Sequence, residues 1–112
     1  MTYQHKEMAA GRWENMPFCE QMANVGSEVE RALNWRDKDN LLYSQKALDR
    51  ALELLDLTID CVEKKSYLKE LTRIREALLD FFVGENFYKW NKESIKKFFY
   101  YFGLNARREQ SK

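Results

Sequence analysis

The sequence contains few of the residues on which catalysis or β-structure would depend. Its 112 residues include one proline, four glycines and a single histidine, His5. So few turn-forming residues argue against an all-β chain. A lone histidine in a stretch without apolar periodicity gives little basis for acid–base or triad chemistry. No P-loop, dinucleotide-binding glycine motif or zinc-protease motif is present. We therefore expect no catalytic residue, no cofactor and no evident small-molecule substrate.

Metal ligands are equally scarce. The two cysteines, Cys19 and Cys61, stand apart from any C-x-x-C pair, and one histidine does not complete the usual ligand set of a structural zinc site. A di-metal helical bundle usually carries Glu-x-x-His pairs, which this chain lacks, so we expect no metal site. Two states of the cysteines stay open: reduced, buried thiols, which we favour, or a disulfide between the first and second helices.

Nothing in the sequence indicates a membrane protein. No run approaches the ~20 apolar residues that a spanning helix needs, and the polar N-terminus has no apolar signal-peptide region. The net charge of +1 predicts no strong overall attraction to nucleic acid or to an anionic membrane. We expect a cytoplasmic protein.

Helical periodicity dominates the middle of the chain, from Leu41 to Gly84. Two sets of apolar residues recur there at steps of three and four, which is the spacing of one helical face. The sets are Leu48, Leu52, Leu55, Ile59 and Val62, then Leu68, Leu71, Ile74, Leu78 and Phe82. The polar break at 63–66 predicts two antiparallel helices, with Ser66 as N-cap of the second and Gly84 ending it at a positive φ. One long bent helix is the alternative.

A further helix is predicted on the N-terminal side of this region. Pro17 fits its first turn, and its apolar spacing continues to about Trp35. Small residues around Gly26 would let a neighbouring helix approach closely. A polar turn comes next, in which Asp39 or Asn40 can cap the following helix.

The last helix comes after an aromatic loop over 85–90 and is capped by Asn91. Its inner face is formed by Ile95, Phe98, Phe99 and Phe102. The chain is thus predicted to have a flexible N-terminal arm (1–12), one helical domain (13–108) and a frayed tail (109–112). The fold class is all-α: a four-helix bundle with short loops and up-down-up-down topology.

Aromatic residues and positive charge concentrate near the C-terminus. Ten of the sixteen aromatic residues lie between Phe81 and Phe102, and residues 86–112 carry seven basic against two acidic side chains. The core of the last helix leaves four aromatics for a partner surface, most simply a homo-oligomer interface: Tyr88, Trp90, Tyr100 and Tyr101. Alternatively, interleaved cations could neutralise nucleic-acid phosphates while rings stack on bases: Lys89, Lys92, Lys96, Lys97, Arg107 and Arg108. Crowding of a monomer core is the third explanation.

Two arginines offer a weaker functional indication. Arg31 and Arg75 lie beside the apolar stripes, near Glu30 and Glu76. An arginine–carboxylate pair in a groove between helices would be the basis of an enzymatic function. Arginines that cover apolar surface while keeping their charge in water are commoner, and we favour that interpretation.

Three stretches resemble an uncharacterised family of small prokaryotic helical proteins. They are 13–35, with Gly26 central to its 20–33 segment, the leucine-rich run 51–58, and 75–88 through Gly84. In size, helix count and basic end, the chain also resembles the four-helix bundles encoded by intervening sequences in 23S ribosomal RNA genes and the related accessory proteins of diversity-generating retroelements. That resemblance implies a pentameric, basic bundle that associates with nucleic acid without catalysis.

A third resemblance is to HEPN helical domains. Their ribonuclease motif is an arginine followed several residues later by a histidine. Here His5 precedes every arginine, so the resemblance implies at most a catalytically silent relative. Taken together, the sequence predicts a non-enzymatic bundle that acts through self-association and partner binding. The alternative is a nucleic-acid-binding accessory bundle.

Overall fold

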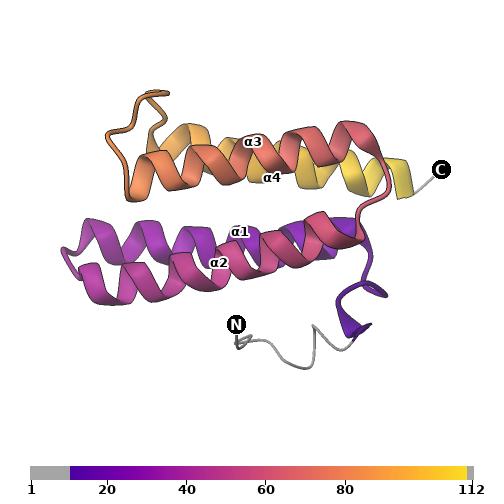
Figure 1. The fold of residues 1–112 in the computed structure, drawn as a ribbon, viewed down its shortest axis with the longest axis horizontal. Coiled ribbons are helices and arrows are strands. Elements are labelled where there is room, and N and C mark those ends of the chain that lie inside the picture. Colours follow the sequence, from indigo (N-terminus) through magenta and orange to yellow (C-terminus); the bar gives the residue numbers. More distant parts are fainter. Residues whose placement is uncertain (1–10, 111–112) are drawn as a thin grey trace.

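The computed structural model describes residues 11–110, which fold into four helices (Figure 1). The helices are α1 (Phe18–Asp37), α2 (Leu41–Cys61), α3 (Lys65–Phe82) and α4 (Lys92–Gln110). No strand occurs in this part of the chain, so the predicted all-α, four-helix class is confirmed. The alternative of one long bent helix is wrong, because residues 62–64 leave the helical conformation between α2 and α3.

The two ends of the chain are only partly covered by this description. Most of the predicted arm (1–12), including His5, and the last two residues of the predicted tail (109–112) lie outside residues 11–110. Both assignments therefore stay predictions, although α4 continues as far as Gln110.

Contacts between helix ends fix the topology. Phe18 at the start of α1 stacks on Tyr67 at the start of α3, with ring centroids 4.5 Å apart. At the other ends of these helices, Arg36 donates a hydrogen bond to the carbonyl of Phe81. Helices α1 and α3 are therefore parallel. Lys92 at the start of α4 pairs with Asp37 at the end of α1, and Phe102 in the middle of α4 meets Phe18 near the start of α1 at 5.6 Å, so α4 runs antiparallel to α1. Consecutive helices alternate in direction (Figure 1), which is the predicted up-down-up-down arrangement.

The helices form two layers, α1 with α2 and α3 with α4 (Figure 1). Burial of the apolar stripes between them is the main source of stability, at roughly 25 cal/mol per Å². The largest fully buried side chains are Trp13, Met22, Leu33, Leu48, Leu55, Leu71, Ile74, Leu78, Ile95, Val25, Val29 and Thr58. The predicted phenylalanines of α4 are partly buried and pack against this core.

The segment before α1 belongs to the core as well. The indole Nε1 of Trp13 donates a 3.0 Å hydrogen bond to Oγ1 of Thr58 on α2, and both side chains are buried. The side chain of Gln21 donates to the Trp13 carbonyl at 2.8 Å. Because buried polar groups require partners, these bonds fix the approach of the chain to α1.

Two asparagine caps are confirmed. The side chain of Asn40 accepts from the amide of Tyr43 at the start of α2. Before α4, Asn91 Oδ1 accepts from the Ser94 amide at 2.8 Å, and Ser94 Oγ accepts in return from the Asn91 amide at 2.9 Å. Each side chain thus satisfies a backbone donor that the helix leaves unpaired.

Two other predicted helix signals are wrong. Ser66 is not the N-cap of α3, because the helix already begins at Lys65 and Lys64 occupies the cap position without a side-chain capping hydrogen bond. Gly84 comes after α3 as predicted, but its φ is not positive. Glycine eases a close approach there instead, since a Cβ would lie 3.1 Å from the carbonyl oxygen of Asp80, tighter than an ordinary contact.

The small residues of α1 do permit close helix packing. A Cβ added at Gly26 would lie 3.4 Å from Cβ of Phe99, so α4 passes directly over this glycine. Within residues 11–110, no helix combines the length and apolar character needed to cross a lipid bilayer.

Candidate interaction surface

The loop between α3 and α4 is tied to the last turn of α3. The carboxylate of Asp80 accepts hydrogen bonds from the backbone amides of Phe87 and Tyr88, at 2.8 and 2.9 Å. The backbone amide of Asn86 donates to the Asp80 carbonyl at 3.0 Å. One residue of α3 therefore holds three consecutive amides of the loop, and the two carboxylate bonds are of the stronger, charge-assisted kind.

A second set of bonds closes the loop on itself. The side chain of Asn86 donates to the carbonyl of Trp90 at 2.7 Å and accepts from its amide at 2.9 Å. Asn86 and Lys89 both take positive φ, 54° and 55°. Asparagine tolerates this left-handed conformation, but lysine does so at a cost in energy. Such a conformation persists only where the surrounding bonds fix it, so the loop has a defined shape.

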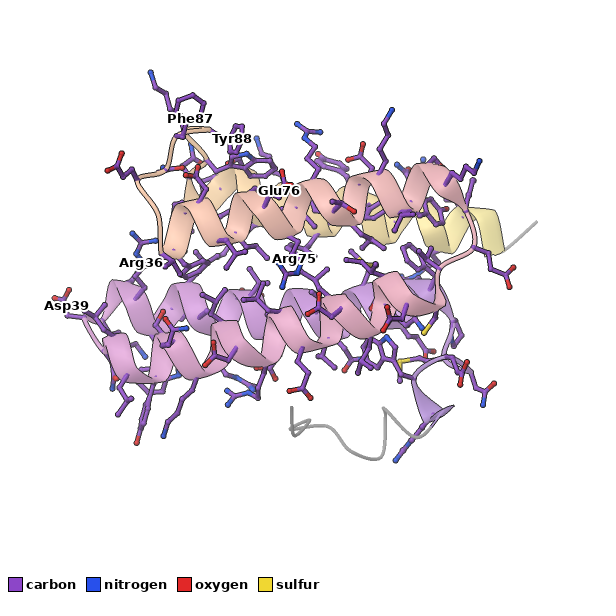
Figure 2. The ribbon with its side chains drawn as sticks, viewed as in Figure 1. Arg36, Asp39, Arg75, Glu76, Phe87 and Tyr88 are labelled. Atoms are coloured by element: carbon purple, nitrogen blue, oxygen red, sulfur yellow. The ribbon has the colours of Figure 1, made fainter. Side chains whose placement is uncertain are left out.

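This fixed loop presents aromatic side chains to solvent. Phe87 is 81% exposed and Tyr88 is 58% exposed. Their rings pack edge to face with centroids 5.5 Å apart. Figure 2 shows both side chains directed away from the helices. A rigid loop that exposes a phenylalanine contributes little to the core, and exposed apolar clusters mark interaction sites when they are contiguous.

The four predicted interface residues fall into three environments. Tyr100 and Tyr101 on α4 are 66% and 56% exposed, with ring centroids 5.2 Å apart. Tyr88 is exposed on the loop. Trp90 is only partly exposed, because it packs against the core and meets the ring of Phe98 at 6.3 Å. Three of the four side chains are thus available to a partner over most of their surface. We call Phe87, Tyr88, Tyr100 and Tyr101 the exposed aromatic set.

The six predicted nucleic-acid-binding cations differ in their surroundings. Lys92 pairs with Asp37, and Lys96 lies 3.8 Å from Glu30. The hydrogen bond between Asp37 and Lys92 lowers the pKa of the Asp37 carboxyl and raises the pKa of the Lys92 ammonium. The other four side chains are exposed: Lys89, Lys97, Arg107 and Arg108. Lys92 and Lys96 therefore each lie beside a carboxylate of α1, and the wider Lys96–Glu30 pair is the weaker of the two.

Comparison of the chain with protein-family models, curated proteins and solved structures finds no match.

The two arginines proposed for an enzymatic pocket have structural partners. Arg75 on α3 pairs with Asp56 on α2, with Nε 2.8 Å from Oδ1, and Figure 2 places Arg75 between the two layers. Arg31 pairs with Glu28 at 3.0 Å. The prediction that these arginines pair with Glu30 and Glu76 is therefore wrong. Both pairs are partly exposed, and the Arg75–Asp56 pair joins adjacent helices, which suits a structural role.

Metal and thiol chemistry receives no support from this geometry. Within residues 11–110, no three histidine, cysteine, aspartate or glutamate side chains are grouped to hold a metal ion. No disulfide joins Cys19 and Cys61, which are both half-buried. Cys61 donates to the carbonyl of Leu57 at 2.9 Å, and burial raises the pKa of its thiol.

Some exposed apolar residues carry no signal in the sequence. Phe87 is one of them, because loop residues have no period from which to infer direction. Leu41, Leu42 and Tyr43 at the start of α2 are also exposed. Leu41 lies seven residues before buried Leu48, in the same phase of the helix, but it is the first residue of α2. Periodicity alone does not reveal that a position lies at the end of a bundle.

Proposed function

We propose that this protein is a non-catalytic helical bundle that acts by self-association and by binding partners through its exposed aromatic set. The observation that supports this most is the Asp80 anchor. Its carboxylate holds the amides of Phe87 and Tyr88 while their side chains remain in solvent. A loop built only to connect two helices needs neither the fixed shape nor the exposed phenylalanine.

Pre-organisation makes such a loop suited to binding. Association loses less conformational entropy when the contacting side chains are already ordered. Aromatic side chains are enriched among the few residues that contribute most to interface affinity. The near-neutral chain, with a net charge of +1, opposes self-association only weakly by charge repulsion. A second copy of the chain is therefore the first partner to test.

Nucleic-acid binding is a second candidate, supported by the outer surface of α4. Lys97 precedes Tyr101 by four residues, and Arg108 lies seven residues after it, so the three share one helical face. All three side chains are exposed. A tyrosine between two cations can stack on an unpaired base while the cations neutralise phosphates.

Sedimentation equilibrium with and without single-stranded RNA tests both proposals. Self-association predicts a mass above one chain at micromolar concentration without RNA, whereas a single-chain mass would contradict it. If the four exposed cations bind phosphates, the logarithm of RNA affinity should fall with the logarithm of salt concentration at a slope of about −3. A slope near zero would exclude the nucleic-acid proposal and leave self-association unaffected.

A further inference from the structure

A cavity of 360 Å³ opens between α1 and α4. Its apolar wall is made by Met22, Val29 and Leu33 from α1 and by Phe99 from α4. This volume lies at the lower end of the range of about 300–1,000 Å³ that is typical of small-molecule sites. The cavity is separate from the loop that carries Phe87 and Tyr88, although Tyr100 of the exposed aromatic set is among its lining residues. Ligand binding here therefore does not require the loop to bind a partner.

Glycine makes room for the cavity on the side of α4. Gly103 lines it, and a Cβ added there would find no atom within 4 Å. Gly26 lines the opposite wall, but a Cβ there would contact Phe99 at 3.4 Å. The space in front of Gly103 is therefore open, and a larger side chain at this position would grow into the cavity.

Charged side chains stand around the apolar wall, with an excess of positive charge. The cavity is lined by two cations, Lys96 and Arg107, and by one carboxylate, Glu30. Lys96 lies 3.8 Å from Glu30, and both side chains are partly exposed, so this ion pair is weak. An anionic group that enters beside an apolar body would find charge complementarity here, whereas a cationic group would not.

We propose that this cavity binds an amphiphile with an aliphatic body and a carboxylate head. The aliphatic body contacts Met22, Val29, Leu33 and Phe99. The carboxylate lies near Lys96 and Arg107.

Calorimetric titration with three ligands of equal chain length tests the charge requirement. Decanoate carries the predicted head, 1-decanol is uncharged, and decylammonium carries the opposite charge. A hydrogen bond to a charged group contributes about 1.5–3 kcal/mol, so decanoate should bind at least about tenfold more tightly than decanol, and decylammonium more weakly still. Equal affinities for the three ligands, or no binding of decanoate, would overturn the proposal.

The glycines supply an internal map of the binding position. The chain has four, of which Gly26 and Gly103 line the cavity, whereas Gly11 and Gly84 do not. In amide NMR spectra, decanoate should shift the Gly26 and Gly103 signals and leave the other two in place. Equal shifts at all four would indicate non-specific association of the alkyl chain.

Two substitutions separate a blocked site from a damaged fold. Gly103→Leu should abolish decanoate binding without lowering the thermal midpoint, because leucine is a better helix former than glycine. Lys96→Gln should weaken decanoate binding about tenfold, whereas Lys69→Gln on the exposed surface of α3 should not change it. If the Gly103→Leu protein still binds decanoate, or if Lys69→Gln weakens binding as much as Lys96→Gln, the assignment of the cavity is wrong. The glycine map on the unsubstituted protein decides the question even if a variant fails to fold.

Discussion

Replacing Asp80 by alanine should release the α3–α4 loop while leaving the bundle folded. The substitution removes the carboxylate that accepts from the amides of Phe87 and Tyr88. A carboxylate in the last turn of a helix opposes the helix dipole, so its presence there is a local cost. Asp80 therefore stabilises the loop that it positions and does not favour the helix that contains it.

The expected loss of stability is small because gains and losses nearly offset. Two hydrogen bonds of about 1 kcal/mol each are lost. Removing the negative charge from the helix end recovers about 0.5 kcal/mol, and alanine recovers about 0.5 kcal/mol through its helix propensity. Asp80→Ala should therefore cost about 1 kcal/mol, or about 4 °C in thermal midpoint. Asp80→Asn keeps one acceptor oxygen and should cost about 0.5 kcal/mol.

Urea unfolding measures the global change, and amide hydrogen exchange measures the local one. In Asp80→Ala, the amides of Phe87 and Tyr88 should exchange much faster than in the unsubstituted protein, because local opening no longer breaks a bond to the carboxylate. Amides in the middle of α2 serve as the control and should change only by the small global loss. If the Phe87 and Tyr88 amides keep their protection, Asp80 does not hold the loop, and the main support for a pre-organised surface is lost.

Three further predictions concern the bundle itself. Trp13→Phe removes the buried hydrogen bond to Thr58 and part of a fully buried ring, so urea unfolding should show a loss of about 2–3 kcal/mol, and a loss below about 0.5 kcal/mol would contradict the core position. The guanidinium of Arg36 donates a hydrogen bond to the Phe81 carbonyl at the end of α3 and lies over the Phe81 ring. Arg36→Lys loses this planar group and should cost about 1 kcal/mol in the same assay. The lowered pKa of Asp37 means that its pair with Lys92 stabilises the fold above the ordinary carboxyl pKa and that this contribution is lost as the pH falls through the lowered value. The raised pKa of Lys92 gives the opposite pH dependence at alkaline pH. The stability that the pair contributes is complete below the ordinary ammonium pKa and is lost as the pH rises through the raised value. Thermal midpoints of the unsubstituted and Asp37→Asn proteins should therefore converge at both extremes of pH, and curves that stay parallel throughout would refute the linkage.

The helices can be predicted from the sequence because burial of apolar stripes determines them. Steps of three and four place Leu48 and Leu55 on one face of α2, and both are fully buried. Asn40 and Asn91 can be identified as caps because a short polar side chain before an apolar run satisfies the first free amides of the helix. These signals are local, and tertiary contacts do not override them.

Helix ends without a strong cap cannot be placed from the sequence. The start of α3 at Lys65 lies one residue before Ser66, because Lys64, in an extended conformation, occupies the N-cap position without a side-chain capping hydrogen bond. At the other end, the advantage of glycine at position 84 comes from close contact with the backbone of Asp80, which depends on how the following loop folds back. A single sequence records neither constraint.

The candidate site is only partly predictable for the same reason. Tyr100 and Tyr101 can be identified because the core of α4 has its own phenylalanines, and both tyrosines are exposed. The directions of Phe87 and Trp90 depend on the left-handed conformations at Asn86 and Lys89, which have no periodic signature. The sequence therefore indicates an excess of aromatic rings but not which of the loop rings faces solvent.

The central claim is that the exposed aromatic set serves association rather than folding. The most direct test is the sedimentation mass of a variant in which Phe87, Tyr88, Tyr100 and Tyr101 are all serine, with Leu42→Ser as a control that removes an exposed apolar side chain elsewhere. We expect the unsubstituted and control proteins to sediment as multiples of the 13.5 kDa chain. The four-serine variant should sediment as a single chain with unchanged helical content. A single-chain mass for the unsubstituted protein at tens of micromolar, or loss of helical structure in the four-serine variant, would contradict the claim.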